Sequence, residues 1–266
     1  MTTHTPALEV TGIAKSYGDN AVLRGIDLCV PTGTVYALLG PNGAGKTTMV
    51  RILSTLISAD DGVARVAGFD VRTEPDGVRR SIGVTGQFSA IDELLTGREN
   101  LRLMADLAHL TAAVARARVD ELLGRFELVD AADRRAATYS GGMKRRLDLA
   151  MTLVSRPRLI FLDEPSTGLD PRSRRDLWQI VRELLTEGVT IFLTTQYLEE
   201  ADQLAHTVGL LDGGRLVATG TPAELKAQTG GTTLDDVFLA LTGRAVTDDD
   251  NHDNHDNHDQ DKESVR

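Results

Sequence analysis

The sequence of 266 residues is 41% hydrophobic and 26% charged, the composition of an ordinary globular protein with one large or two small domains. Its net charge of −10 lacks the basic excess of a nucleic-acid binder, so we expect no nucleic-acid partner. Its apolar runs have the length of strands, far short of the roughly 20 residues of a membrane-spanning helix. Residues 1–6 lack the pattern of a signal peptide. We therefore expect cytosolic residence.

The segment Leu8–Val30 alternates apolar and polar residues around a turn at residues 17–20, which predicts an antiparallel hairpin. It contains Cys29, which has no second cysteine in the sequence with which to form an internal disulfide. Because Cys29 lies in an apolar stretch, we expect a buried structural thiol and not a reactive one.

The apolar run Val35–Leu39 predicts a strand buried on both faces, and a helix is expected over Lys46–Leu56. Between them lies a complete phosphate-loop motif, G-x-x-x-x-G-K-[ST], whose glycines let the backbone N–H groups point at phosphate oxygens. We expect Lys46 to reach the β- and γ-phosphates of ATP and Thr47 to ligate Mg²⁺. The residues expected to bind the nucleotide here are Gly40, Pro41, Asn42, Gly43, Ala44, Gly45, Lys46, Thr47 and Thr48.

Farther along the chain, strands and helices alternate. Leucines and alanines at three- and four-residue spacing predict helices between Arg98 and Val129, and we interpret about residues 88–157 as an inserted helical subdomain. The remaining expected strands are Ile82–Thr85, Leu159–Leu162 and Val189–Thr194, and the remaining helices follow Ser140 and span Pro171–Leu185. Such alternation indicates an α/β fold with a mostly parallel sheet that is covered on both faces.

The acidic pair Asp163-Glu164 follows the predicted strand Leu159–Leu162 at its C-terminal end, where ligands bind in open α/β sheets. We expect Asp163 to hold Mg²⁺ and Glu164 to polarise the attacking water as general base. An acidic pair alone is more often a solvated strand end. Together with the phosphate loop, it predicts a site that hydrolyses ATP.

Beyond Gly243 an acidic tail without aromatic residues begins, in which Asn-His-Asp repeats three times from Asn251 to Asp259. This composition cannot bury enough apolar surface to offset the entropy of ordering, so we predict disorder over residues 244–266. The histidine spacing leaves open an adventitious affinity for metal ions.

The sequence Tyr-Ser-Gly-Gly-Met-Lys-Arg-Arg over residues 139–146 resembles the signature motif of the ABC ATPases. The Ser140 side chain and the amides of Gly141 and Gly142 are placed to cap a helix N-terminus, which suits an anion. In that family this cradle binds the ATP held by the phosphate loop of a partner domain. The resemblance therefore implies a second copy of the chain and a dimer with two composite sites.

The resemblance extends over most of residues 8–243. It implies a P-loop NTPase core over residues 8–220, with an N-terminal antiparallel β-subdomain and the inserted helical subdomain, and a helical extension over residues 221–243. It also implies roles for Tyr17, which would stack on adenine, for Gln87, which would sense Mg²⁺ and the water and link to the membrane partner, and for Asp170 in the D-loop, which would communicate across the dimer. An ordinary turn tyrosine is the alternative interpretation of Tyr17.

Two positions depart from the family pattern. Tyr139 and Met143 replace the usual Leu and Gln at the variable ends of the signature. Gln196 stands where most members have a histidine that contacts the γ-phosphate. A glutamine amide can donate a hydrogen bond but cannot become cationic or relay a proton, so we expect slower hydrolysis that persists, with no pH response from this position. A non-hydrolysing chain is the alternative, and the intact Glu164 argues against it.

Two stretches, residues 194–202 and 234–243, resemble the daunorubicin-resistance branch of actinobacterial exporters. The resemblance implies a peripheral ATPase, with ATP and Mg²⁺ as cofactors, that docks on a separate polytopic permease at the cytoplasmic face of the membrane and powers efflux of hydrophobic antibiotics. The second stretch has a structural alternative, an amphipathic helix that packs a C-terminal subdomain. An importer ATPase, a non-drug exporter and a soluble ABC protein acting on DNA or ribosomes stay open, the last disfavoured by the negative charge.

Overall fold

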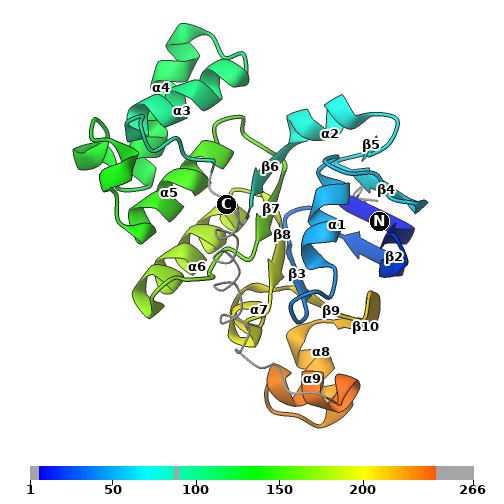
Figure 1. Cartoon of the computed structure of the whole chain (residues 1–266). Coiled ribbons are helices and arrows are strands. Elements are labelled where there is room, and N and C mark those ends of the chain that lie inside the picture. Colours follow the sequence, from blue (N-terminus) through cyan, green and yellow to red (C-terminus); the bar gives the residue numbers. More distant parts are fainter. Residues whose placement is uncertain (1–5, 87–89, 244–266) are drawn as a thin grey trace, which may run out of the picture.

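The computed structural model describes residues 6–86 and 90–243 of the chain, and its centre is a six-stranded sheet (Figure 1). Its strands, in spatial order, are β10 (Arg215–Gly220), β9 (Thr207–Asp212), β3 (Val35–Leu39), β8 (Thr190–Thr195), β7 (Leu159–Asp163) and β6 (Ile82–Thr85). All neighbours pair in parallel except β10 with β9. The predicted α/β fold with a mostly parallel sheet is confirmed.

The N-terminal strands form a second, antiparallel sheet of four strands. Its order is β2 (Asn20–Val30), β1 (Leu8–Tyr17), β4 (Asp61–Val66) and β5 (Phe69–Asp70). The predicted hairpin is confirmed, but the expected burial of Cys29 is wrong. Cys29 is exposed because successive side chains of a strand point to opposite faces, and its neighbours Leu28 and Val30 occupy the buried face.

Helices cover the parallel sheet on both faces (Figure 1). The helices of the described residues, in chain order, are α1 (Lys46–Leu53), α2 (Pro75–Ser81), α3 (Gly97–Leu107), α4 (Ala112–Arg125), α5 (Gly141–Thr152), α6 (Pro171–Thr186), α7 (Leu198–Leu204), α8 (Pro222–Thr229) and α9 (Leu234–Thr242), with short 3₁₀ turns at Val129–Ala131 and Ala136–Thr138. Helix α1 ends three residues before the predicted Leu56, because the chain turns at Thr55, which has a φ of 64°.

The parallel sheet separates two hydrophobic cores, and β3 contributes to both. Val35, Ala37 and Leu39 pack into the core shared with α5 and α6, whereas Tyr36 and Leu38 pack into the core shared with α1 and the antiparallel sheet. All five side chains are buried, as the continuous apolar run predicted. This double burial fixes the end of β3, from which the phosphate loop departs.

Helices α3 and α4 lie away from the sheet (Figure 1). A capping box begins α3, since the Thr96 side chain accepts from the Glu99 N–H and the Glu99 side chain accepts from the Thr96 N–H. The helical pattern predicted from Arg98 to Val129 is interrupted where His109 adopts a φ of 55°. The boundaries of the helical subdomain stay a prediction.

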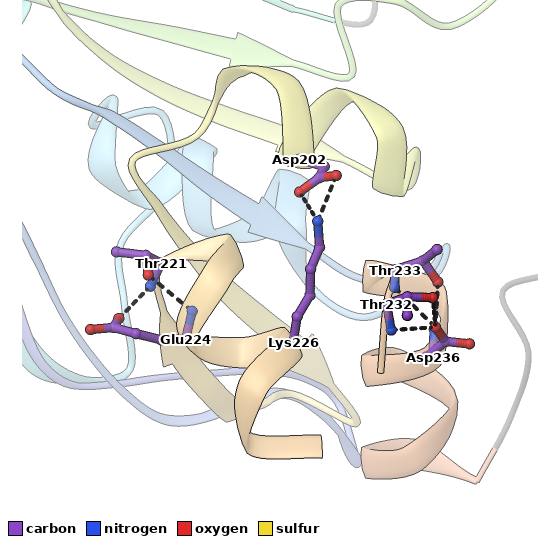
Figure 2. Close-up of polar contacts among 7 residues, drawn as sticks. All are labelled: Asp202, Thr221, Glu224, Lys226, Thr232, Thr233 and Asp236. Carbon is purple, nitrogen blue, oxygen red and sulfur yellow. Dashed lines mark hydrogen bonds and ion pairs between the residues drawn. The ribbon is translucent and has the colours of Figure 1, made fainter. Parts of the chain in front are cut away.

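Helices α8 and α9 pack beside α7 at the end of the described chain (Figures 1 and 2). Capping boxes begin both helices, at Thr221 for α8 and at Thr233 for α9. The Lys226 ammonium group on α8 binds both carboxylate oxygens of Asp202 on α7, at 2.6 and 2.8 Å (Figure 2). Side chains of α9 enter the main hydrophobic core, among them Val237. The tail predicted to be disordered, residues 244–266, lies outside the described residues.

Within the described ranges, no helix has both the length and the apolar character that crossing a bilayer requires.

Candidate functional site

The loop from residue 40 to residue 45 joins the C-terminal end of β3 to the N-terminus of α1. Two of its glycines are required by close packing: a Cβ at Gly40 would lie 2.3 Å from the Leu211 carbonyl oxygen, and one at Gly45 would lie 2.7 Å from Leu23 Cδ2. Gly45 also has a φ of 109°, a conformation that L side chains rarely adopt. The backbone therefore takes a path that only glycine permits. Helix α1 begins after Gly45 without a hydrogen bond from a capping side chain.

Lys46, the first residue of α1, is only 3% exposed. Its ammonium group donates to the Gly40 and Pro41 carbonyl oxygens, at 2.7 and 3.0 Å, and lies 3.1 Å from Glu164 Oε1. A buried cation beside an open helix N-terminus attracts an anion. Because Lys46 is also paired with Glu164, an incoming phosphate must compete with this carboxylate.

Asp163 ends β7, and its Oδ1 atom accepts hydrogen bonds from two hydroxyl groups, those of Thr194 and, at 3.3 Å, of Thr47. Thr194 belongs to the neighbouring strand β8, and it also holds Glu164, the residue that follows Asp163. The Glu164 N–H donates to the Thr194 carbonyl oxygen at 3.0 Å and to its hydroxyl oxygen at 3.1 Å. These bonds hold Glu164 at a φ of 48°, a strained conformation for a residue other than glycine.

These groups open into one cavity of about 930 Å³. Of the residues predicted to form the site, those that line it are Asn42, Gly43, Gly45, Lys46, Thr47, Thr48, Glu164 and Gln196. The other lining residues are Asn20, Val22, Thr167, Gly168, Arg174 and Tyr197. The structure thus brings together a buried cation, a helix N-terminus and a carboxylate, with a second carboxylate, Asp163, directly behind Thr47.

Gln196 lies in the loop between β8 and α7 and is followed by Tyr197. The Tyr197 N–H donates to the Thr195 hydroxyl oxygen at 2.9 Å, and its ring lies 4.9 Å from the Arg174 guanidinium carbon. Arg174 reaches this place from α6, and cation–π contact with Tyr197 holds the two side chains at the cavity wall. Sequence reasoning gave no role to Thr194 or Arg174, because each acts through a residue distant in the sequence.

The signature residues lie elsewhere. Ser140 and Gly142 line a second cavity, of about 220 Å³, together with Asp170. Ser140 caps α5 as predicted, its hydroxyl oxygen accepting from the Met143 N–H at 3.3 Å. Gly141 is the first residue of α5.

Asp170 acts as the N-cap of α6. Its carboxylate accepts from the Ser173 hydroxyl at 2.7 Å and from the Ser173 and Arg172 N–H groups at 3.0 and 2.9 Å. These hydrogen bonds, the one from the Ser173 hydroxyl first, hold the pKa of Asp170 below its usual range. Whatever its role across a dimer, Asp170 fixes the loop that leads into α6.

Two further predicted site residues stand apart from the main cavity. Tyr17 ends β1, is 48% exposed and is not among the residues that line it; its ring lies 5.6 Å from the Lys15 ammonium nitrogen. Gln87 lies outside the described residues. In the part of the chain that the structure describes, no group of three or more His, Cys, Asp and Glu side chains is arranged to hold a metal ion.

The chain is similar to known proteins over most of its length. Residues 23–167 match the ABC transporter family. The chain is 55% identical over 232 residues (87% of this chain and 73% of the relative) to the daunorubicin resistance ATP-binding protein DrrA3 of Streptomyces coeruleorubidus. It is 50% identical over 244 residues (91% and 72%) to the doxorubicin resistance ATP-binding protein DrrA of Mycobacterium tuberculosis. It is 41% identical over 232 residues (87% and 76%) to the Nod factor export ATP-binding protein I of Paraburkholderia xenovorans.

The fold is similar to that of a solved ATP-binding subunit of an ABC transporter, with a TM-score of 0.80 and 31% identity. The superposition covers 90% of this chain and all of the solved one.

Proposed function

Because this chain belongs to the ABC transporter family of ATP-binding proteins, we propose that its ATPase activity powers the export of hydrophobic drugs through a separate membrane permease. Binding and hydrolysis of ATP are general in this family, and a transporter ATP-binding subunit acts with a membrane partner. The observation that carries the choice of cargo is the 50–55% identity, over most of the chain, to daunorubicin and doxorubicin resistance proteins. The proposed location is the cytoplasmic face of the cell membrane.

The 41% identity to a Nod factor export protein favours a second candidate, an exporter with a cargo other than a drug. The two candidates share the ATPase site and the direction of transport. They differ in the permease, which forms the path of the cargo, so the two require a test in cells.

We assign the nucleotide to the cavity of the phosphate loop. Lys46 and the loop N–H groups bind the phosphates, and Glu164 activates the attacking water as general base. Gln196 lines the same cavity and is placed to donate a hydrogen bond to the γ-phosphate. Tyr17, on the neighbouring sheet, is the residue proposed to stack on adenine, and Gln87 is proposed to link this site to the permease.

Thr47 and Asp163, beside the phosphate loop, have the side chains that a Mg²⁺ site requires. The Thr47 hydroxyl and the Asp163 carboxylate oxygen lie 3.3 Å apart, and both are hard oxygen donors of the kind Mg²⁺ prefers. Bound there, Mg²⁺ would neutralise charge on the phosphates. Thr194 orients the Asp163 carboxylate through its hydroxyl group.

We propose that two copies of the chain form the complete site. Ser140 and Gly142 line the second cavity and not the cavity of Lys46, and Gly141 lies between them as the first residue of α5. The exposed helix N-terminus is suited to the ATP held by another copy. ATP would then join two chains, and its hydrolysis would let them separate.

Replacement of Gln196 by His should leave ATP turnover equal or raise it, by up to about tenfold. The imidazole can donate the same hydrogen bond and can also carry a proton, so the turnover of the variant should acquire a pH dependence centred near pH 6.5, about the ordinary pKa of His. The measurement is steady-state ATPase activity from pH 5.5 to 8.5. Gln179→His, at an exposed position on α6, is the matched control; a collapse of turnover in Gln196→His alone would show that the glutamine has its own role.

Replacement of Lys46 by Ala should abolish drug export. Loss of a buried charge-assisted contact to phosphate should weaken ATP binding by about 30- to 150-fold. In a host strain that lacks the gene, accumulation of daunorubicin should fall on complementation with the parent chain and stay high with Lys46→Ala. Lys226→Ala, which removes a lysine that does not line the cavity, is the control for the loss of a lysine charge.

The permease is identified by purifying the tagged Glu164→Gln chain with ATP from detergent-solubilised membranes of its host. Recovery of a polytopic membrane protein in equal amount supports a transporter. If that protein is recovered while daunorubicin accumulation is the same with and without the chain, the non-drug exporter replaces the drug exporter. Recovery with ribosomal or DNA-repair proteins alone would overturn both.

A further inference from the structure

A cluster of polar side chains lies between α5, α6 and α7, behind the cavity of the phosphate loop. At its centre is the Glu200 carboxyl group on α7, which is 0% exposed. Its Oε1 atom accepts a hydrogen bond of 3.1 Å from Trp178 Nε1 on α6. The other members are Ser166 in the D-loop, Arg174 on α6, and Arg145 and Asp148 on α5.

The charges of this cluster act on one another. Burial raises the pKa of Glu200, an effect opposed by the side chains of Thr195, Trp178 and Ser166 and by the Arg174 charge. Burial likewise lowers the pKa of Arg145, and the nearby Asp148 and Glu200 carboxylates oppose that change. Glu200 therefore faces the D-loop, the end of β8 and two arginines from two helices.

Several buried atoms of the cluster have no hydrogen-bond partner among the described residues. They are Glu200 Oε2, Ser166 Oγ, Arg145 Nε and Nη2, and Arg174 Nε. A buried carboxyl group whose hydrogen bonding is incomplete is a poor means of stabilising a fold, and an apolar side chain would pack the same space at less cost. Unsatisfied groups that gather in one place call for a functional explanation.

Four members of the cluster are joined to a part of the proposed ATPase site. Glu200 lies in the first turn of α7, the helix that follows the loop of Gln196. Ser166 lies two residues after Glu164, and Arg145 lies on the helix that Ser140 caps. Arg174 contacts both the cavity and Tyr197.

We propose that Glu200 is a positioning residue for ATP hydrolysis, which holds the Gln196–Tyr197 loop in place against the D-loop at Ser166 and against α6 at Trp178. The carboxyl group accepts from Trp178 on one side, and its second oxygen and the nearby Ser166 hydroxyl are both buried without a well-formed hydrogen bond. The inference rests on the proposed roles of Glu164 and Gln196 at the neighbouring cavity.

The test compares Glu200→Gln with Glu199→Gln, its exposed neighbour on the same helix, in the full chain. Glutamine keeps the size and the oxygen that accepts from Trp178 but cannot ionise. We expect Glu200→Gln to lower kcat by about tenfold and to leave KM for ATP within about twofold, because a buried polar contact near the reacting groups is disturbed while the phosphate-binding residues are intact. Glu199→Gln should match the parent.

Trp178 supplies a direct spectroscopic readout, because it is the only tryptophan of the chain. Addition of ATP and Mg²⁺ should change its fluorescence emission in the parent and in Glu199→Gln, and the change should be largely lost in Glu200→Gln. Trp178→Phe, which removes the indole N–H donor and keeps an aromatic ring, should lower kcat in the same direction. Combined with Glu200→Gln it should add little, since the two residues act together.

Thermal unfolding separates this role from a structural one. The raised pKa of Glu200 means that the folded chain binds its proton more tightly than the unfolded chain, so its ionisation costs stability as the pH rises above the ordinary value of 4.5. At pH 7, Glu200→Gln should therefore unfold at the same temperature as Glu199→Gln or higher, and this advantage should vanish below pH 4.5. The charges of Arg145, Asp148 and Arg174 face this group and are unchanged in the variant.

A Glu200→Gln chain whose kcat and emission change equal those of Glu199→Gln would overturn the proposal. So would a chain that loses activity only in proportion to lost stability. A parent chain that binds and hydrolyses no ATP would instead sink the proposed function, and the inference with it.

Discussion

Replacement of Glu164 by Gln should reduce ATP turnover by about 10²- to 10³-fold, because an amide cannot accept the proton of the attacking water. ATP binding should persist or become tighter. Glu164 Oε1 lies 3.1 Å from the Lys46 ammonium group, in a pair whose side chains are 13% and 3% exposed. Removal of this buried negative charge frees Lys46 for the phosphates and lessens repulsion between the carboxylate and the nucleotide.

The measurements are single-turnover ATP hydrolysis and equilibrium binding of ATP. Glu199→Gln serves as the control for an exposed carboxylate of the same kind. If Glu164→Gln turned over at the parental rate, the assignment of the base would be wrong. If it lost ATP binding together with turnover, Glu164 would act in holding the loop and not in the chemical step.

The parts of the site that were predictable from the sequence are those in which the proposed functional residues are neighbours along the chain. The loop from Gly40 to Thr47 can be recognised in the sequence, because a backbone that curls around phosphate needs glycines, lysine and threonine at a fixed spacing. Asp163 and Glu164 were predictable because a buried strand that ends in two acids places them at the ligand-binding edge of a parallel sheet. Strands β3, β6, β7 and β8 follow from similar apolar runs, whereas β4, β5, β9 and β10 were not predicted.

What the sequence did not reveal depends on contacts across the fold. Thr194 looks like one more residue of a buried strand, yet its two oxygens set the orientation of Asp163 and Glu164. Arg174 and Glu200 lie in helices in which charged residues are common, and only the packing of α6 on α7 places Arg174 at the cavity wall and Glu200 behind it. The predicted burial of Cys29 was wrong for a simpler reason. In a strand with one buried face, the register decides which side chains are exposed.

The separation of the two cavities has a mechanistic consequence. The residues proposed to hold phosphate and the residues of the signature serve different nucleotides if two copies pair about a two-fold axis, with each phosphate loop opposite the signature of the other copy. A change at the signature should then leave the binding of ATP to a single chain intact and prevent the joining of two chains. A change at the phosphate loop should prevent both.

Replacement of Ser140 by Arg in the Glu164→Gln chain should therefore abolish ATP-dependent dimerisation and leave ATP affinity within about twofold. The arginine side chain would fill the space at the N-terminus of α5, where Ser140 accepts from the Met143 N–H. Loss of this cap alone costs only about 1 kcal/mol, and Ser140→Ala in the same background measures that part separately. Light scattering with ATP should give twice the chain mass of 28.7 kDa for Glu164→Gln, and the monomer mass for Ser140→Arg in that background.

The alternative is a signature that serves the ATP of its own chain. In that case Ser140→Arg would weaken ATP binding by the monomer, because the N–H groups at the start of α5 would contact the nucleotide bound beside Lys46. The distribution of these residues between the two cavities argues against it, since Ser140 and Gly142 line one and Lys46, Thr47 and Glu164 line the other. A dimer that persists in Ser140→Arg at parental affinity would mean that the chains meet through another surface, and the signature would then have no part in joining them.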